Sequence, residues 1–172
     1  MSMRTNAKDY SHIREATPND LEEILAIYNE AILTTTAIYE YDPFDRSYIE
    51  TWWNQRITNG WPVIIAEYDG QVAGFATYGT FRARAAYQST CEHSVYVKEI
   101  YRGKGIGRML LRAIIDAARK NRVHVLIGGI DAQNQLSISL HESEGFTIAG
   151  HLHEVAYKFN RWLDLVFLEK KL

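Results

Sequence analysis

The sequence predicts a mixed α/β fold in a single domain, and two patterns lead to this class. Strand-like residues 63–68 and 71–78 flank Asp69-Gly70, a two-residue hairpin signal. Three later segments form a β-α-β unit: a β-rich run at 91–97, an amphipathic helix at 105–121 and an apolar strand at 123–130. A hairpin and a β-α-β connection in one chain indicate a mixed sheet covered by helices.

The remaining elements follow from local start and stop signals. Residues 1–10 are expected to form a flexible tail, and 11–172 the single domain, which opens with a strand at 11–15. Thr17 and Pro18 then start a helix whose apolar face holds Leu21, Ile24, Leu25, Tyr28 and Ile32. Four further segments are predicted: a helix at 45–58 ended by Asn59-Gly60, a helix at 134–144 closed by Gly145, and strands at 151–159 and 162–168.

Composition narrows the class of partner. The 172 residues are 47% hydrophobic and carry a formal charge of −2, which is enough for a core and gives no overall basic field. We therefore expect a small-molecule ligand, with no nucleic-acid or membrane partner. Cys91 is the only cysteine, residues 1–12 lack an apolar segment, and no aliphatic run approaches the roughly 20 residues of a membrane span. A cytoplasmic protein is the expectation.

A glycine-rich segment carries the clearest chemistry. The strand that ends Val95-Tyr96-Val97 leads into Arg102-Gly103-Lys104-Gly105-Ile106-Gly107-Arg108 and then into the amphipathic helix. Unpaired N–H groups and the dipole at such a helix start can bind a pyrophosphate, glycine allows close approach, and the basic side chains add charge. A basic helix cap is the alternative. The spacing disfavours a Rossmann fingerprint, which would need glycine at Arg108, and a Walker loop, which would need Ser or Thr after Lys104.

A second polar set lies on the helix predicted at 134–144. Asn134, Ser137 and His141 recur at helical spacing and so lie near one face. Polar side chains on the inner face of a helix need a ligand or a protein partner. Asn134 could equally cap its own helix, and His141 could be a hydrogen-bonded core histidine.

With these two elements the chain resembles the GNAT acetyltransferase superfamily. Its acetyl-CoA signature, (R/Q)-x-x-G-x-G/A, matches 102–107, and its later helix motif matches 134–146, with His141 where many members have tyrosine. The chain is most similar to phosphinothricin, methionine sulfoximine and methionine sulfone N-acetyltransferases. The matching segments are 26–29, 35–39, 92–97, 140–141 with 145–146, and 158–164. The resemblance implies a twisted, mostly antiparallel sheet with a splayed parallel pair at Val95 and Val123, helices on both faces, and a homodimer.

The resemblance also implies catalytic roles. Glu92, which shares a strand face with Ser94 and Tyr96, would be the general base that deprotonates the amine; an exposed strand glutamate is the alternative. His141 would relay a proton or orient the reacting groups. Backbone N–H groups of 95–97 would meet the thioester carbonyl, and Asn134 and Ser137 would bind the pantetheine arm with the glycine-rich turn.

The expected substrate residues are Tyr39, Arg82, Arg84, His93 and Ser94. Either arginine could bind a carboxylate or phosphinate of the substrate, and Arg84 could equally be a solvated surface side chain. Cys91 is taken as a core residue, because direct transfer needs no acyl-enzyme. We therefore expect acetyl transfer from acetyl-CoA to the amine of a small amino acid, without a metal. Rival readings are acetylation of a protein N-terminus, polyamine or aminoglycoside, and a non-catalytic acyl-CoA sensor.

Overall fold

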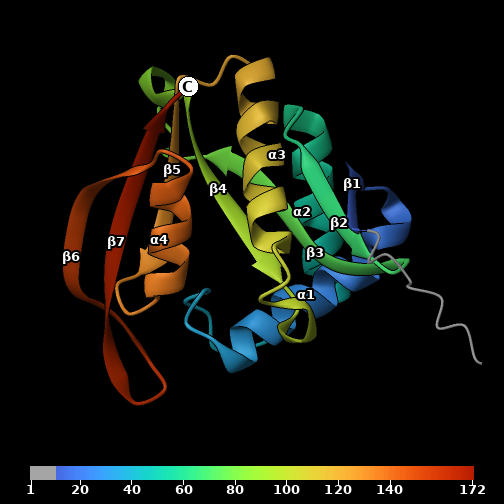
Figure 1. Cartoon of the computed structure of the whole chain (residues 1–172), viewed down its shortest axis with the longest axis horizontal. Helices are drawn as coiled ribbons and strands as arrows, with labels where there is room; N and C mark the ends of the chain where they lie inside the picture. The colour runs from blue at the N-terminus through green and yellow to red at the C-terminus, as the bar shows by residue number, and fades with distance from the viewer. Residues whose placement is uncertain (1–10) are drawn as a thin grey trace, which may run out of the picture.

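The computed structural model describes residues 11–172, and these form one seven-stranded sheet with four α-helices (Figure 1). The predicted tail at 1–10 lies outside the described residues. The strand order is β1-β2-β3-β4-β5-β7-β6. The strands are β1 Ser11–Glu15, β2 Val63–Tyr68, β3 Gln71–Thr80, β4 Thr90–Val97, β5 Val125–Asp131, β6 Thr147–Lys158 and β7 Arg161–Lys171. The helices are α1 Leu21–Thr34, α2 Arg46–Asn59, α3 Ile106–Lys120 and α4 Gln135–Ser143.

Local signals in the sequence produce these elements. Asp69 and Gly70 both have positive φ, 50° and 77°, and join β2 to β3. Thr17 and Asp20 form a capping box at a short 3₁₀ turn before α1. Gly60 ends α2 in the left-handed conformation at φ 65°. The predicted hairpin and helix ends are therefore confirmed.

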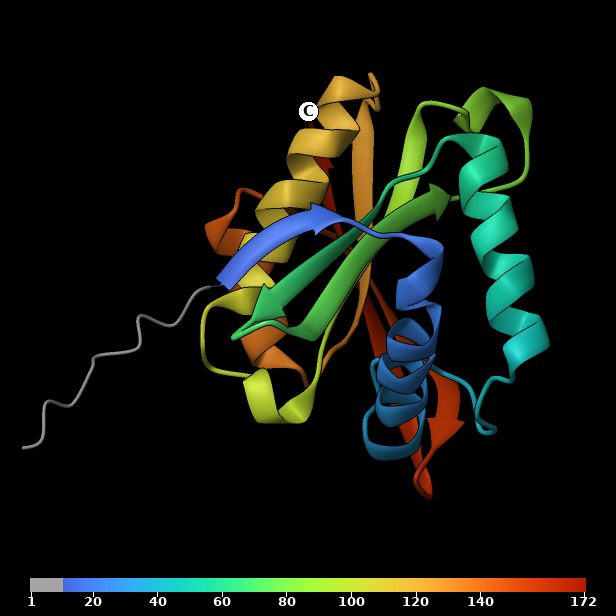
Figure 2. The same ribbon diagram turned by 90° about the vertical axis from the view of Figure 1, so that its right-hand side faces the viewer.

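Helices cover both faces of the sheet, as predicted (Figure 2). On one face α1 and α2 bury an aromatic-rich cluster that includes Tyr28, Trp52 and Phe75. On the other face α3 packs its apolar side, including Leu110 and Ile114, against the strands. Among the described residues no helix is long and apolar enough to cross a membrane.

The only parallel pairing in the described sheet is between β4 and β5, and it is short. It joins Thr90–Glu92 to Val125–Ile127 and then stops. The two strands pair as expected, but neither Val95 nor Val123 is in the ladder. Val123 precedes β5, and β4 has turned away from β5 toward the start of α3 before it reaches Val95 (Figure 1). The mostly antiparallel sheet with one splayed parallel pair is confirmed.

Candidate active site

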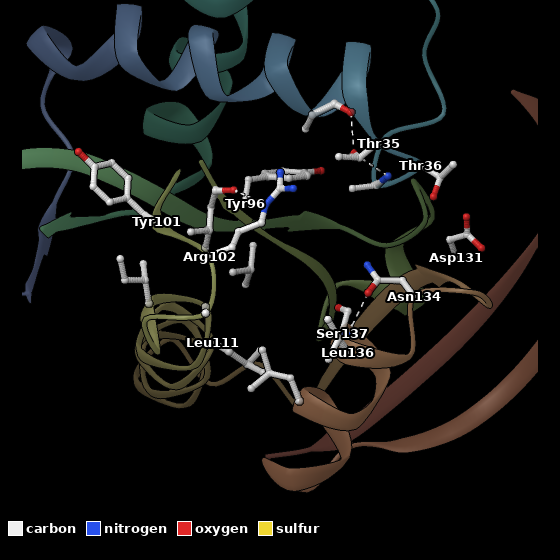
Figure 3. Close-up of a pocket in the computed structure, with 18 of the residues that line it drawn as sticks. Thr35, Thr36, Tyr96, Tyr101, Arg102, Leu111, Asp131, Asn134, Leu136 and Ser137 are labelled. Atoms are coloured by element: carbon white, nitrogen blue, oxygen red, sulfur yellow. Dashed lines mark hydrogen bonds between the residues drawn. The ribbon is translucent and has the colours of Figure 1, made fainter. Parts of the chain in front are cut away.

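A cavity of about 830 Å³ occupies the gap where β4 leaves β5 (Figure 3). That volume suits a small-molecule or cofactor site. Its walls come from the C-terminal half of β4, the glycine-rich turn, the first turns of α3, α4 and the end of α1 with the loop after it. The lining residues include Ile27, Glu30, Ala31, Thr35, Thr36, Ala37, Val95, Tyr96, Val97, Arg102, Gly103, Gly105, Ile106, Gly107, Arg108, Asp131, Asn134, Ser137, Leu140, His141 and Arg161.

The start of α3 presents bare backbone to this cavity. Gly105 is the N-cap residue at φ 82°, so no side chain caps the helix. The first helical bond runs from the Met109 N–H to the Gly105 carbonyl at 3.1 Å. The N–H groups of Ile106, Gly107 and Arg108 therefore have no intrahelical acceptor, and the positive end of the dipole lies with them. This arrangement can bind a phosphate or pyrophosphate.

The three basic residues of the turn have different surroundings. Arg102 and Arg108 line the cavity. Arg108 is also 3.3 Å from Glu144. The Lys104 ammonium instead lies 4.4 Å from the centre of the Tyr68 ring and is not part of the lining. Two of the three expected cationic side chains thus border the cavity, and the third is engaged by an aromatic ring.

The polar face of α4 forms the opposite wall. The Asn134 Oδ1 accepts a hydrogen bond from the Ser137 N–H at 3.1 Å, so Asn134 caps its helix (Figure 3). Both residues also line the cavity. The cap uses only the oxygen of the Asn134 amide, so the cap interpretation and a ligand-binding role are compatible.

Alternation along β4 separates the predicted residues onto two faces. Tyr96 packs against the aromatic cluster under α1 and α2. Glu92 and Ser94 lie four and two residues before it on the strand and so project to the same face. His93 faces the other way and is buried, with its ring centre 5.2 Å from that of Phe146. His93 and Ser94, both expected substrate residues, therefore point to opposite faces of the strand.

Glu92 lies at the closed end of the splay, as the last β4 residue paired with β5. Its carboxylate stands against Gly129, where a β-carbon would come within 3.1 Å of Oε1 and within 3.7 Å of the Phe167 ring. Burial raises the pKa of Glu92 above its ordinary value. A carboxylate with a raised pKa is a better proton acceptor than an ordinary surface glutamate.

His93 and His141 form a buried pair behind this strand. Their Nε2 atoms are 2.9 Å apart, the His93 Nδ1 is 2.7 Å from the Ile127 carbonyl, and the His141 Nδ1 is 2.7 Å from the Ser137 carbonyl. Three such contacts need three protons, whereas two neutral rings carry two. Burial lowers the pKa of both rings, that of His93 to about 3, and therefore opposes the third proton.

The expected substrate residues come from three separate segments. Tyr39 donates a hydrogen bond to the Asp164 carbonyl at 3.4 Å, and burial raises its pKa to about 12. The Arg82 guanidinium lies 5.3 Å from the centre of the Phe81 ring. The centres of the Phe81 and Phe167 rings are 6.3 Å apart, and Phe167 and Glu92 both lie against Gly129. The exposed loop with Arg82 and Arg84 borders a separate hollow and not the main cavity.

Sequence reasoning missed one wall of the cavity and two glycines of β5, Gly128 behind His93 and Gly129 behind Glu92. Thr35, Thr36 and Ala37 line the cavity from the loop after α1, about sixty residues before β4 in the sequence. The resemblance did include this loop, and that was the available signal. Gly128 and Gly129 lie in an apolar strand pattern, where isolated glycine marks a close approach of another group.

A strand that splays from its neighbour, with a glycine-rich helix start at the mouth of the gap, is suited to a transferase whose co-substrate carries a phosphate group and an extended arm along the strand. The sequence matches the acetyltransferase (GNAT) domain family over residues 13–167. The chain belongs to this family and is an acetyl-CoA-dependent N-acetyltransferase. The uncapped N–H groups at Ile106–Arg108 and the bordering arginines suit the phosphates of acetyl-CoA.

Three known proteins illustrate the similarity. An L-methionine sulfoximine/L-methionine sulfone acetyltransferase of Pseudomonas aeruginosa is 44% identical over 93% of this chain and 94% of its own. A ribosomal-protein-alanine N-acetyltransferase structure from Brucella melitensis is 48% identical, with a TM-score of 0.91 over 94% of this chain and 99% of its own. A phosphinothricin acetyltransferase from Sinorhizobium meliloti, solved with acetyl-CoA, is 32% identical, with a TM-score of 0.92 over 94% of this chain and 88% of its own.

Proposed function

We propose that this enzyme acetylates the α-amine of a small amino acid of the methionine sulfoximine, methionine sulfone or phosphinothricin type. The activities for which two similar proteins are named support this substrate class. The observation that carries the proposal is the position of Glu92: a partly buried carboxylate at the closed end of the splay, with a pKa raised by burial.

In the proposed mechanism both substrates are bound together and the acetyl group moves directly. Glu92 accepts a proton from the ammonium, directly or through water, and the free amine attacks the thioester carbon. The Val95–Val97 backbone pairs with β3 on one side and has no β5 partner on the other, and its N–H groups that face the gap stabilise the oxyanion. The carbon–sulfur bond then breaks, and the coenzyme A thiolate takes up a proton.

His141 is proposed as a relay in this proton transfer. It borders the cavity, and its contact with His93 leaves the pair one proton short of filling all three hydrogen bonds. Because burial lowers the pKa of both rings, a proton that the pair accepts is passed on quickly and not retained. His93 acts in this scheme through His141, not as a group that touches the substrate.

Arg82 is the proposed partner of the substrate's carboxylate or phosphinate. The ring contacts from Phe81 to Phe167 connect its loop to the surroundings of Glu92. Tyr39 and Ser94 would wall the same side, since Ser94 shares the face of Glu92. Arg84, on the same exposed loop, would add positive charge.

A thiol-release assay with acetyl-CoA and a panel of amines tests the proposal. Methionine sulfoximine, methionine sulfone and phosphinothricin should be turned over with higher kcat/KM than ordinary amino acids, polyamines, aminoglycosides or an alanine-starting peptide. The peptide belongs in the panel because the similar Brucella melitensis protein is named a ribosomal-protein-alanine N-acetyltransferase. Preferential turnover of the peptide would refute the substrate assignment, and no turnover of any amine would favour the sensor reading.

A cytoplasmic homodimer completes the proposal. β6 is an edge strand whose exposed apolar side chains include Ile148, Leu152, Val155 and Tyr157. Exposed apolar edge strands favour pairing with a second chain. Light scattering on a size-exclusion column should give twice the chain mass of 19.8 kDa, and Val155→Asp should reduce it. A monomer at all concentrations would contradict this part.

A further inference from the structure

A group of metal-ligating side chains lies outside the site described above, on the β6–β7 hairpin. His151 and His153 come from β6 and Asp164 from β7. One ligand atom from each lies within 4.8 Å of the others. The acetyl-transfer reaction uses none of these side chains, so the group needs a separate explanation.

Strand register brings the three residues together. His151 pairs with Val166 and Leu152 with Leu165, so His153 stands opposite Asp164 where the ladder breaks at a bulge. His151 and His153 are two apart on the strand and project to one face. Leu165, the next residue on β7, projects to the opposite face, where it lies beside Gly129. The group therefore lies on the other side of the sheet from Glu92.

The distances around Asp164 suit a metal ion. The His151 Nε2 and the His153 Nδ1 each lie 3.0 Å from the Asp164 Oδ2. A tetrahedral zinc ion holds nitrogen and oxygen ligands at about 2.0–2.2 Å, which separates neighbouring ligand atoms by about 3.3–3.5 Å. Small side-chain rotations would open the three atoms to that spacing. The exposed imidazoles also leave room for a water ligand.

The carboxylate is already oriented for this role. Its Oδ1 accepts a hydrogen bond from the Glu154 N–H at 2.9 Å, which leaves Oδ2 directed at both imidazoles. A backbone bond that fixes one carboxylate oxygen is a common support for a metal ligand.

We propose that His151, His153 and Asp164 bind one divalent first-row transition-metal ion of the zinc type. Two imidazoles and one carboxylate suit such ions better than Mg²⁺ or Ca²⁺, which prefer oxygen ligands. The ion has no role in acetyl transfer. It links β6 to β7 next to Asp164, whose carbonyl accepts hydrogen bonds from the Tyr39 hydroxyl and the Ala132 N–H. Binding thus stabilises the hairpin that supports the loop with Tyr39.

Calorimetric titration of chelator-treated protein with ZnCl₂ tests the proposal. The protein must carry no histidine tag, and the pH must lie above the ordinary pKa of histidine so that the ligands are neutral. One equivalent of Zn²⁺ should bind, and Co²⁺ should give the visible absorption of a low-symmetry site. His153→Gln and His151→Gln should each weaken binding at least about tenfold.

His124→Gln is the matched control, because His124 is an exposed histidine outside the group. It should bind Zn²⁺ like the parent. Thermal unfolding with saturating ZnCl₂ should raise the midpoint of the parent and of the control but not of the two histidine variants. Absence of Zn²⁺ binding would overturn the proposal, and so would binding that both variants retain. Neither result bears on acetyl-CoA turnover, so the proposed function is tested separately.

Discussion

Lys158 is buried and forms no ion pair with an acidic side chain among residues 11–172, and its replacement gives a quantitative test of how the site is held together. Its ammonium donates to the carbonyls of Ile32, Thr35 and Ile38 at 2.6, 3.0 and 2.7 Å. Three carbonyl acceptors use all three N–H groups of the charged form. Ile32 lies in the last turn of α1, which has no basic residue of its own. Lys158 thus supplies, from β6, the cation that a helix C-terminus favours.

Lys158→Met should lower the free energy of unfolding by about 3 kcal/mol. The Ile32 carbonyl would lose its partner in a buried place, at a cost of about 1–3 kcal/mol. The Thr35 and Ile38 carbonyls are less buried, so water can replace part of their hydrogen bonds in the variant. Burial also lowers the pKa of Lys158, which means that burying the charged ammonium costs free energy and reduces its net contribution to stability. For a chain of this size, 3 kcal/mol corresponds to a shift of about 6–12 °C in Tm.

Urea and thermal unfolding followed by circular dichroism measure this effect, with Lys171→Met as the control at an exposed β7 lysine. The control should stay within about 0.5 kcal/mol of the parent. The KM for acetyl-CoA should also rise in Lys158→Met, because Thr35, Thr36 and Ala37 line the cavity. Equal stability of the two variants would refute the reasoning that the ammonium holds this loop.

The site itself allows three further tests. Gly129→Ala should lower kcat/KM about tenfold or more, because the new methyl group displaces the Glu92 carboxylate. Gly150→Ala is the control, because a methyl group there meets nothing within 4 Å, and equal kinetics of the two variants would contradict the close approach of Glu92 to Gly129. Glu92→Gln should lower kcat about 10²–10⁴-fold and abolish the loss of activity that the parent shows as pH falls through the raised pKa of Glu92. A carboxyl group whose pKa is raised in the folded state stabilises the fold at low pH, and that contribution is lost as pH rises through the raised pKa. Glu92→Gln should therefore be at least as stable as the parent at neutral pH. A marked drop in the free energy of unfolding in urea would argue against burial as the cause of the raised pKa. Arg102→Ala should raise the KM for acetyl-CoA about tenfold with little change in kcat, as expected for one charge-assisted contact to phosphate, and an unchanged KM would remove Arg102 from the cofactor site.

Local chemistry made most of the fold predictable. The turn at Asp69-Gly70, the helix start at Thr17 and the helix end at Gly60 each depend on a few adjacent residues, and each is found where it was expected. Strand ends depend on distant partners and were less well placed. β6 begins at Thr147, four residues before the expected start, because Thr147 pairs with Glu169 of β7. β7 extends to Lys171 because that residue pairs with Val125 of β5.

The site was predictable to the same extent. The glycine-rich turn and the α4 face are continuous in the sequence, and both line the cavity. The loop after α1 joins them only through tertiary packing, including the bonds from Lys158. The contact of Lys104 with the Tyr68 ring and the inward turn of His93 also depend on neighbours far away in the sequence. Charge and spacing alone could not distinguish a cavity-lining cation from one that packs on an aromatic ring.

The position of the splay follows from residues on both strands. Glu92 and His93 are adjacent on β4 and so point to opposite faces, and each packs against one of two consecutive glycines of β5. A β-carbon at Gly128 would come within 2.8 Å of the His93 ring, and one at Gly129 within 3.1 Å of Glu92. The parallel ladder ends one residue earlier, at Ile127. Two consecutive glycines thus leave room for Glu92, the proposed base, on one face of the sheet and for the His93–His141 pair on the other, at the place where β4 and β5 separate. Because each glycine accommodates a different side chain, alanine at Gly128 should disturb the histidine pair and alanine at Gly129 should disturb Glu92.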